Sequence, residues 1–183
     1  MDLLFSLSYE VWNVTNDFRL SQARNMIRDE GIIGRINALW LPVYPFMAGH
    51  LLALSGVCSG RVLDLGPFAG GLAVSLLRQG GELHATVMDE SQRVLDWAEQ
   101  QARAEGCLSR LVLTRAAIEP IAAPDASFDL VVVRGAFFFL TSRLLCEVKR
   151  VLRAGGLAWV GGGYGPLTPQ RVIAPIAERS KQW

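Results

Sequence analysis

Two acidic residues and a glycine-rich turn are the features of this sequence whose types and spacing could do chemistry. The stretch RVLDLGPFAGGLAVSLL, Arg61 to Leu77, opens like a buried strand, turns through Gly66, Gly70 and Gly71, and continues with helical spacing. Asp64 lies where the strand should end. Such a turn either cradles a pyrophosphate on backbone N–H groups or lets a nucleoside with a charged amino-acid tail approach the backbone.

Two side chains favour the second use. Phe68 stands where the dinucleotide fingerprint G-x-G-x-x-G needs its second glycine, and it would crowd a pyrophosphate. Asp64 would repel a diphosphate, whereas it would attract an ammonium group. The glycines alone are also compatible with an ordinary strand-to-helix turn. Together with the acid, they indicate a site for a nucleoside whose tail is cationic.

A second acid follows at the end of the next strand. Asp89 closes the stretch ATVMD, 25 residues after Asp64. A carboxylate there can accept hydrogen bonds from both ribose hydroxyls of a nucleotide. The alternative is that Asp89 caps the following helix, but Ser91 is an equally good cap.

The elements that must position these residues alternate along the chain. Hydrophobic periodicity predicts helices over residues 17–31, ending at Gly31, and 44–56, with Phe46, Met47, Leu51 and Leu54 on one face. It then predicts strands at 61–65, 82–89, 110–116, 128–135 and 157–163, and helices at 71–80, 91–106, 142–156 and 168–183. The glycines ending 142–156 suit a helix C-cap. Strands alternating with helices predict a doubly wound, mainly parallel α/β sheet with ligands at the carboxyl ends of its strands.

Composition excludes several classes of protein. The 183 residues carry 18 Lys and Arg against 17 Asp and Glu, so the net charge of +1 argues against a nucleic-acid substrate. The three cysteines lack metal-ligand spacing, so no metal is predicted, and they fit buried thiols of a reduced, cytoplasmic protein. No apolar stretch is uninterrupted enough to span a bilayer, and no membrane association is expected.

Four motifs in order carry a family resemblance. VLDLGPFAGG, TVMDESQRVLDWAEQQARAEG, AAIEPIAAPDASFDLVVVRGAFFFL and LLCEVKRVLRAGG lie within residues 61–165. This run resembles the class I S-adenosylmethionine-dependent methyltransferases, whose first motif is D-x-G-x-x-x-G and whose fourth is E-x-x-R-V-L-x-P-G-G. The resemblance implies a Rossmann-like methyltransferase domain over residues 58–183, a helical lid over residues 1–57, and S-adenosyl-L-methionine as cofactor.

The resemblance also implies roles for individual residues. The methionine end of the cofactor would face Asp64, Gly66, Pro67 and Phe68, and Gly70 would allow close approach. Asp89 would hold the ribose, with Glu90 near the adenine. The adenine edge would meet Ala117 and Ile118, and Arg134 and Gly135 would lie near the methyl group. Many members have Asp where Ala117 stands, so only backbone groups remain for the adenine there.

The largest departure from the family is at the end of the sheet. Members commonly have two more strands after the fifth, which are lacking here, so the fifth strand would form an exposed edge. We expect this edge to be covered by the 168–183 helix, by a second copy of the chain, or by a different protein.

Methyl transfer from a sulfonium needs positioning more than a strong base, so the sequence carries no sharp catalytic signature. Tyr164, in the glycine-rich loop GGGYGP, is the preferred catalytic candidate, ahead of His50, which fits a core or capping histidine. Tyr9, Trp12, Trp40 and Tyr44 would form a lid or pack in the core. The phenylalanines of AFFFL would line an apolar pocket for a small-molecule methyl acceptor or bury the next helix.

Two other functions compete with the methyltransferase. One is a cofactor-binding subunit that has lost catalysis, which Ala117 and the short C-terminus favour and the two acids oppose. The other is a nicotinamide-dependent reductase, which Phe68 and Asp64 oppose.

Overall fold

A five-stranded parallel sheet organises the described residues, which are 29–136 and 139–180 of this computed structural model. The strands are β1 (Ser59–Leu65), β2 (Glu82–Asp89), β3 (Leu111–Arg115), β4 (Phe128–Arg134) and β5 (Leu152–Gly161). Their order is β3-β2-β1-β4-β5, so the chain reverses direction across the sheet between β1 and β4. This is the doubly wound α/β arrangement predicted from the sequence, and it places the carboxyl ends of β1, β2 and β4 along one edge.

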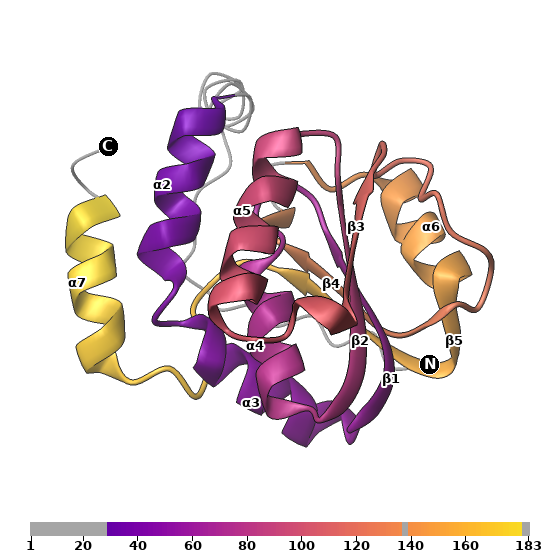
Figure 1. The fold of residues 1–183 in the computed structure, drawn as a ribbon, viewed down its shortest axis with the longest axis horizontal. Coiled ribbons are helices and arrows are strands. Elements are labelled where there is room, and N and C mark those ends of the chain that lie inside the picture. The colour runs from indigo at the N-terminus through magenta and orange to yellow at the C-terminus, as the bar shows by residue number, and fades with distance from the viewer. Residues whose placement is uncertain (1–28, 137–138, 181–183) are drawn as a thin grey trace.

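The helices cover both faces of the sheet (Figure 1). They are α2 (Glu30–Trp40), α3 (Tyr44–Ser55), α4 (Gly71–Gln79), α5 (Gln92–Ala104), α6 (Ser142–Val151) and α7 (Gln170–Ser180), with a short 3₁₀ turn, η1, at Leu108–Arg110. Figure 1 shows α3, α4 and α5 on one side of the sheet and α6 on the other, with α2 beside α5 and α7 beyond α2.

Alternate strand residues supply two separate cores. Val62, Leu130 and Val132 pack against α3 and α4, whereas Leu63 and Val131 pack against α6. Because both faces are covered, the middle of β4, residues 130–133, is a continuous buried apolar run, as its valines indicated. Asp64 and Arg134 occupy positions in this alternation that face α3 and α4, and both are buried.

The start of the first described helix corrects a prediction. Gly31 does not end a helix but lies in the first turn of α2, because the Asp29 carboxylate accepts hydrogen bonds from the N–H groups of Gly31 and Ile32 at 2.9 and 3.1 Å. The rest of the helix predicted over residues 17–31 lies outside the described residues, apart from its last positions.

Helix α3 ends as predicted, with Gly56 in the left-handed conformation, but its buried face differs. Tyr44, Met47, Ala48 and Leu51 are buried, whereas Leu54 is 42% exposed. These buried residues belong to the main core, so α3 is packed against the domain as one of its layers.

The boundary between α6 and β5 was also predicted wrongly. The strand begins at Leu152, which pairs with Phe128, and an irregularity in the register follows between Phe128 and Leu130. Gly155 and Gly156 therefore lie inside β5 and do not cap α6. The expectation of buried thiols holds for Cys107 alone, because Cys58 and Cys146 are exposed.

No single described helix is both long and apolar enough to cross a membrane. The pair α2 and α3 passes on length and composition only, and a bend of 69° separates the two helices.

Candidate functional site

The turn after β1 is held together by Asp64. Its Oδ2 atom accepts hydrogen bonds from the backbone N–H groups of Gly70 and Ala73, at 2.9 and 3.1 Å, so the carboxylate closes the turn and caps α4. Its Oδ1 atom is buried and has no hydrogen-bond partner among the described residues. Asp64 therefore fixes the conformation of the glycine turn through one carboxylate oxygen. Its other oxygen is left without a hydrogen-bond partner among the described residues.

Two glycines of the turn are required for different reasons. Gly66 has a φ of +91°, and a Cβ there would lie 2.9 Å from the Phe139 ring. Gly70 has a φ of +105°, and a Cβ there would lie 2.6 Å from the Cβ of Ala98 in α5. Gly66 thus faces the segment after β4, whereas Gly70 allows α5 to pack against the turn.

Arg134 joins this turn to α2. Its Nη2 donates to Asn37 Oδ1 at 3.1 Å, and its Nε donates to the Phe68 carbonyl at 3.4 Å. Asn37 in turn donates to the Pro67 carbonyl at 3.2 Å. The guanidinium also lies over the rings of Trp40, Tyr44 and Phe68, 4.6 to 5.2 Å from their centroids. A single buried cation at the end of β4 therefore contacts the glycine turn, α2 and α3.

Burial shifts the proton equilibria of this cluster. Desolvation raises the pKa of Asp64 to about 6, although the N–H groups of Gly70 and Ala73 and the charge of Arg134 lower it. Desolvation raises the pKa of Tyr44 to about 12, and it lowers the pKa of Arg134 from its usual value. Asp64 is the member of the cluster whose charge changes near neutral pH.

A cavity of about 750 Å³ opens beside the turn. From the carboxyl edge of the sheet it is lined by Pro67, Asp89, Glu90, Ile118 and Phe139. Helices α2 and α5 supply the remaining wall, which consists of Gly31, Ile33, Gly34, Asn37, Ser91, Arg93, Val94, Asp96, Trp97 and Gln100. Its volume is within the range of cofactor sites, and its wall combines apolar side chains with several charged and polar ones. Among the described residues there is no group of three or more metal-ligating side chains.

The predicted cofactor residues fall into two groups. Asp89, Glu90, Pro67 and Ile118 line the cavity. Asp89 is buried, and its Oδ1 accepts a hydrogen bond from Ser91 N–H at 2.8 Å, so it also shapes the turn into α5. Ala117 is exposed beside Ile118.

The second group lies beneath the cavity. It consists of Asp64, Gly66, Phe68, Gly70, Arg134 and Gly135, none of which lines the cavity among the described residues. The buried ring of Phe68 covers Arg134 and leaves no room for a Cβ at Gly135. These residues support the turn, and Phe139 and Asn37 stand between them and the open space.

Trp40, one of the predicted lid aromatics, contacts Tyr164, the predicted catalytic residue. Tyr164 stacks on Trp40 with ring centroids 4.7 Å apart and planes at 11°, and Trp40 lies over Arg134. Tyr164 does not line the cavity. Tyr44 is fully buried in the core, and His50 packs edge-on against Trp159. Tyr9, Trp12, Phe137 and Phe138 lie outside the described residues.

Sequence reasoning missed the wall that α2 and α5 contribute. Asn37 is a lone amide in the apolar stretch GIIGRINALW, and that contrast is the signal that could have marked it. Trp97 and Val94 carried no such signal, because they are spaced as ordinary buried positions of an amphipathic helix.

Comparison with known proteins identifies the family. A family model described as a methyltransferase domain matches residues 62–156, which is more than half of the chain. The chain belongs to the class I S-adenosylmethionine-dependent methyltransferase family. The predicted family and fold are thereby confirmed, and S-adenosylmethionine is the cofactor of that family.

Solved structures of this methyltransferase fold are similar to the chain. A protein from Methanococcus maripaludis, assigned as an S-adenosyl-L-methionine-dependent methyltransferase, matches with a TM-score of 0.70 and 24% identity over 91% of this chain and 73% of its own. A Galdieria sulphuraria protein, assigned as a sarcosine dimethylglycine methyltransferase, matches with a TM-score of 0.55 and 22% identity over 75% of this chain and 53% of its own.

A third structure contains a ligand. The methyltransferase from Thiobacillus denitrificans in complex with S-adenosyl-L-homocysteine matches with a TM-score of 0.50 and 22% identity over 62% of this chain and 48% of its own. The methyltransferase chain described here thus spans about half the length of the second and third of these proteins. No curated protein sequence matches it.

Proposed function

We propose that this methyltransferase binds S-adenosylmethionine in the cavity between the sheet edge and α2, and transfers its methyl group to a small-molecule acceptor. The observation that carries the proposal is the cavity itself, because Asp89, Glu90 and Ile118 meet in its wall. A carboxylate at the end of the second strand suits the ribose hydroxyls, and an apolar side chain beside it suits the face of a base.

The buried cluster beneath the cavity would serve the methionine end. Arg134 carries a positive charge suited to the carboxylate of the tail, and Asp64 carries a negative charge suited to its ammonium group. Phe139 would have to turn away from Gly66 to expose this end of the site, because its ring lies against that glycine. The residues that would hold the nucleoside part thus already line the cavity. The tail could reach its residues only after Phe139 moves away from Gly66.

The bound cofactor supplies an activated methyl group on a sulfonium, which is transferred to a nucleophile by in-line displacement. The chain's contribution is to orient the two reactants and exclude water. Helix α2, with Trp40 stacked on Tyr164, forms the cover over this end of the sheet. The apolar rings of Phe139 and Trp97 favour a small hydrophobic acceptor over a nucleic acid.

Turnover would test this function. The purified chain is incubated with S-adenosylmethionine and a panel of small thiols, amines, carboxylates and phenols, and formation of S-adenosylhomocysteine is measured. We expect at least one acceptor to be methylated, and Asp89→Ala to abolish most of the turnover at subsaturating cofactor.

Two results would favour the competing functions. Tight binding of S-adenosylmethionine with no turnover on any acceptor would favour a cofactor-binding subunit without catalysis. Stabilisation by NADH with none by S-adenosylhomocysteine would favour a reductase.

A further inference from the structure

Residues 116–127 connect β3 to β4 and contain no helix or strand. They form the edge of the cavity that would face the cofactor's base. Ile118 lines the cavity from this segment. Its neighbour Ala117 has only a methyl group, so any polar recognition of a purine here must come from backbone N–H and C=O groups. Backbone groups recognise a base only if the backbone is held in one position.

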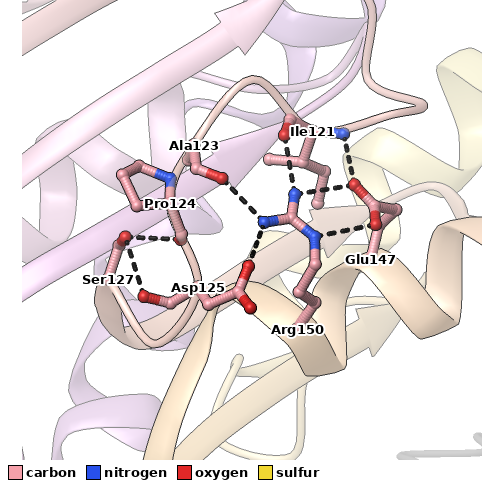
Figure 2. Close-up of polar contacts among 7 residues, drawn as sticks. All are labelled: Ile121, Ala123, Pro124, Asp125, Ser127, Glu147 and Arg150. Carbon is pink, nitrogen blue, oxygen red and sulfur yellow. Dashed lines mark hydrogen bonds and ion pairs between the residues drawn. The ribbon is translucent and has the colours of Figure 1, made fainter.

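Arg150 of α6 holds the second half of this segment (Figure 2). Its Nη1 donates to the Ala123 carbonyl and to the Asp125 carboxylate, at 2.8 and 2.7 Å. Its Nη2 donates to the Ile121 carbonyl at 2.8 Å. One guanidinium therefore fixes three residues of the segment from a single helical position.

Glu147, one turn earlier on α6, fixes the guanidinium in turn. The carboxylate accepts from Arg150 Nε and Nη2, both at 2.8 Å, and from the backbone N–H of Ile121, also at 2.8 Å. The hydrogen bonds from Arg150 lower the pKa of Glu147 to about 2, so the pair stays charged at any physiological pH. Ile121 is thus held through both its N–H and its carbonyl (Figure 2).

Glu119 holds the first half, directly beside Ile118. Its carboxylate accepts a hydrogen bond from Thr141 Oγ1 and lies 3.3 Å from Arg143 Nε. Thr141 is the N-cap of α6, where its Oγ1 also accepts from Leu144 N–H at 2.9 Å. Both ends of α6 therefore anchor the segment, and α6 itself is fixed to the sheet by Leu144, Val148 and Val151.

We propose that Arg150 and Glu147 are positioning residues for recognition of the cofactor's base, because they fix Ile121 and Ala123 in the same segment that brings Ile118 to the cavity. The inference rests on the proposed function, since it assumes that the cavity holds an adenosyl group. It gives the E-x-x-R pair of α6 a role at a site that neither side chain lines.

The test compares two ligands that differ only in the base. S-adenosylhomocysteine and S-inosylhomocysteine, which has an oxo group in place of the adenine amine, are titrated into the full chain by calorimetry. We expect the wild type to prefer the adenine ligand and Arg150→Met to lower the ratio of the two dissociation constants at least fivefold. Arg150→Lys should recover part of the ratio, because it restores the charge and some of the donors.

The matched control is Arg153→Met. Arg153 Nη1 makes an equally short 2.7 Å contact with a carboxylate, that of Asp129, but on β5 and away from the segment. The ratio of the two dissociation constants for Arg153→Met should equal that of the wild type. A merely structural role for Arg150 would weaken both ligands by the same factor and leave the ratio unchanged, and that result would overturn the inference.

A second variant keeps the inference testable if Arg150→Met does not fold, as judged by circular dichroism. Glu147→Ala removes the carboxylate that fixes Arg150 and Ile121 and should lower the same ratio, and an unchanged ratio would overturn the inference. A wild type that binds neither ligand would refute the proposed function itself. A wild type that binds both ligands equally would refute only the positioning of the base.

Discussion

At the scale of residues, the single side chain of Asp64 makes the stability of the fold depend on pH. Burial raises its pKa to about 6 from an ordinary value of 3.8. The folded state therefore holds the proton at a higher pH than the unfolded chain does. By linkage, the contribution of Asp64 to the free energy of unfolding falls as the pH rises from about 4 to about 6, and is constant above that range.

Asp64→Asn tests this linkage. The amide oxygen can still accept from Gly70 and Ala73, but the side chain no longer ionises. We expect the free energy of unfolding of the variant, relative to the wild type, to be about 2 kcal/mol higher at pH 7.5 than at pH 4.5. Urea denaturation at the two pH values measures this difference, and equal values at both would show that the buried carboxyl is not the titrating group.

The catalytic assignment of Tyr164 stays a prediction, and Tyr164→Phe tests it. The substitution keeps the ring that stacks on Trp40 and removes only the hydroxyl. If the hydroxyl is a general base, kcat should fall by about 10²–10⁴ with an unchanged dissociation constant for S-adenosylmethionine. Unchanged kcat would remove Tyr164 from the catalytic candidates, and Tyr164→Leu would then report the contribution of the stack.

At the scale of elements, Asn37 determines how firmly α2 covers the site. Asn37→Ala would leave the Pro67 carbonyl and one N–H group of Arg134 without their partner. We expect a loss of about 1–3 kcal/mol in the free energy of unfolding, because buried polar groups that lose a partner are costly.

Hydrogen exchange should locate the effect of this variant. We expect amide protection to fall across α2 and to stay unchanged in β4. Ala38→Ser, at an exposed position of the same helix, serves as the control. Loss of protection spread evenly over the sheet would show that Asn37 supports the whole fold and not the attachment of α2.

The helices and strands differ in how accurately their bounds could be predicted from the sequence. β2 was predicted residue by residue, because alternation and the acid at its end are local features. Gly31 was misread because the N-cap Asp29, two residues before it, starts α2 at Glu30, so the glycine lies in the first turn of that helix. The glycines of β5 were misread because pairing with the distant residue Phe128 extends the strand back to Leu152.

The candidate site shows the same division. Asp64, Asp89 and the glycine turn could be predicted, because a strand end followed by a helix fixes where they lie. The reason for Gly70 could not, since Ala98 approaches it from another helix. The cluster around Arg134 likewise joins four elements, and no local pattern specifies that meeting.

At the scale of the whole molecule, β5 pairs with β4 and forms one edge of the sheet among the described residues. The expectation that the 168–183 helix, a second copy of the chain or another protein covers this edge stays a prediction. Light scattering on a sizing column, from 1 to 100 µM protein, tests the second copy. A mass near twice 20.0 kDa that returns to a single chain in Ala154→Lys would support it, and a single-chain mass throughout would contradict it.

The most direct test of the account is calorimetric titration of the chain with S-adenosylmethionine, beside Asp89→Ala and Glu82→Ala. Glu82 begins the strand that Asp89 ends, and it lies outside the cavity. We predict micromolar binding by the wild type and by Glu82→Ala, and an affinity at least tenfold weaker, about 1.4 kcal/mol, for Asp89→Ala. No binding by the intact chain, or equal binding by all three proteins, would contradict the proposed cofactor site.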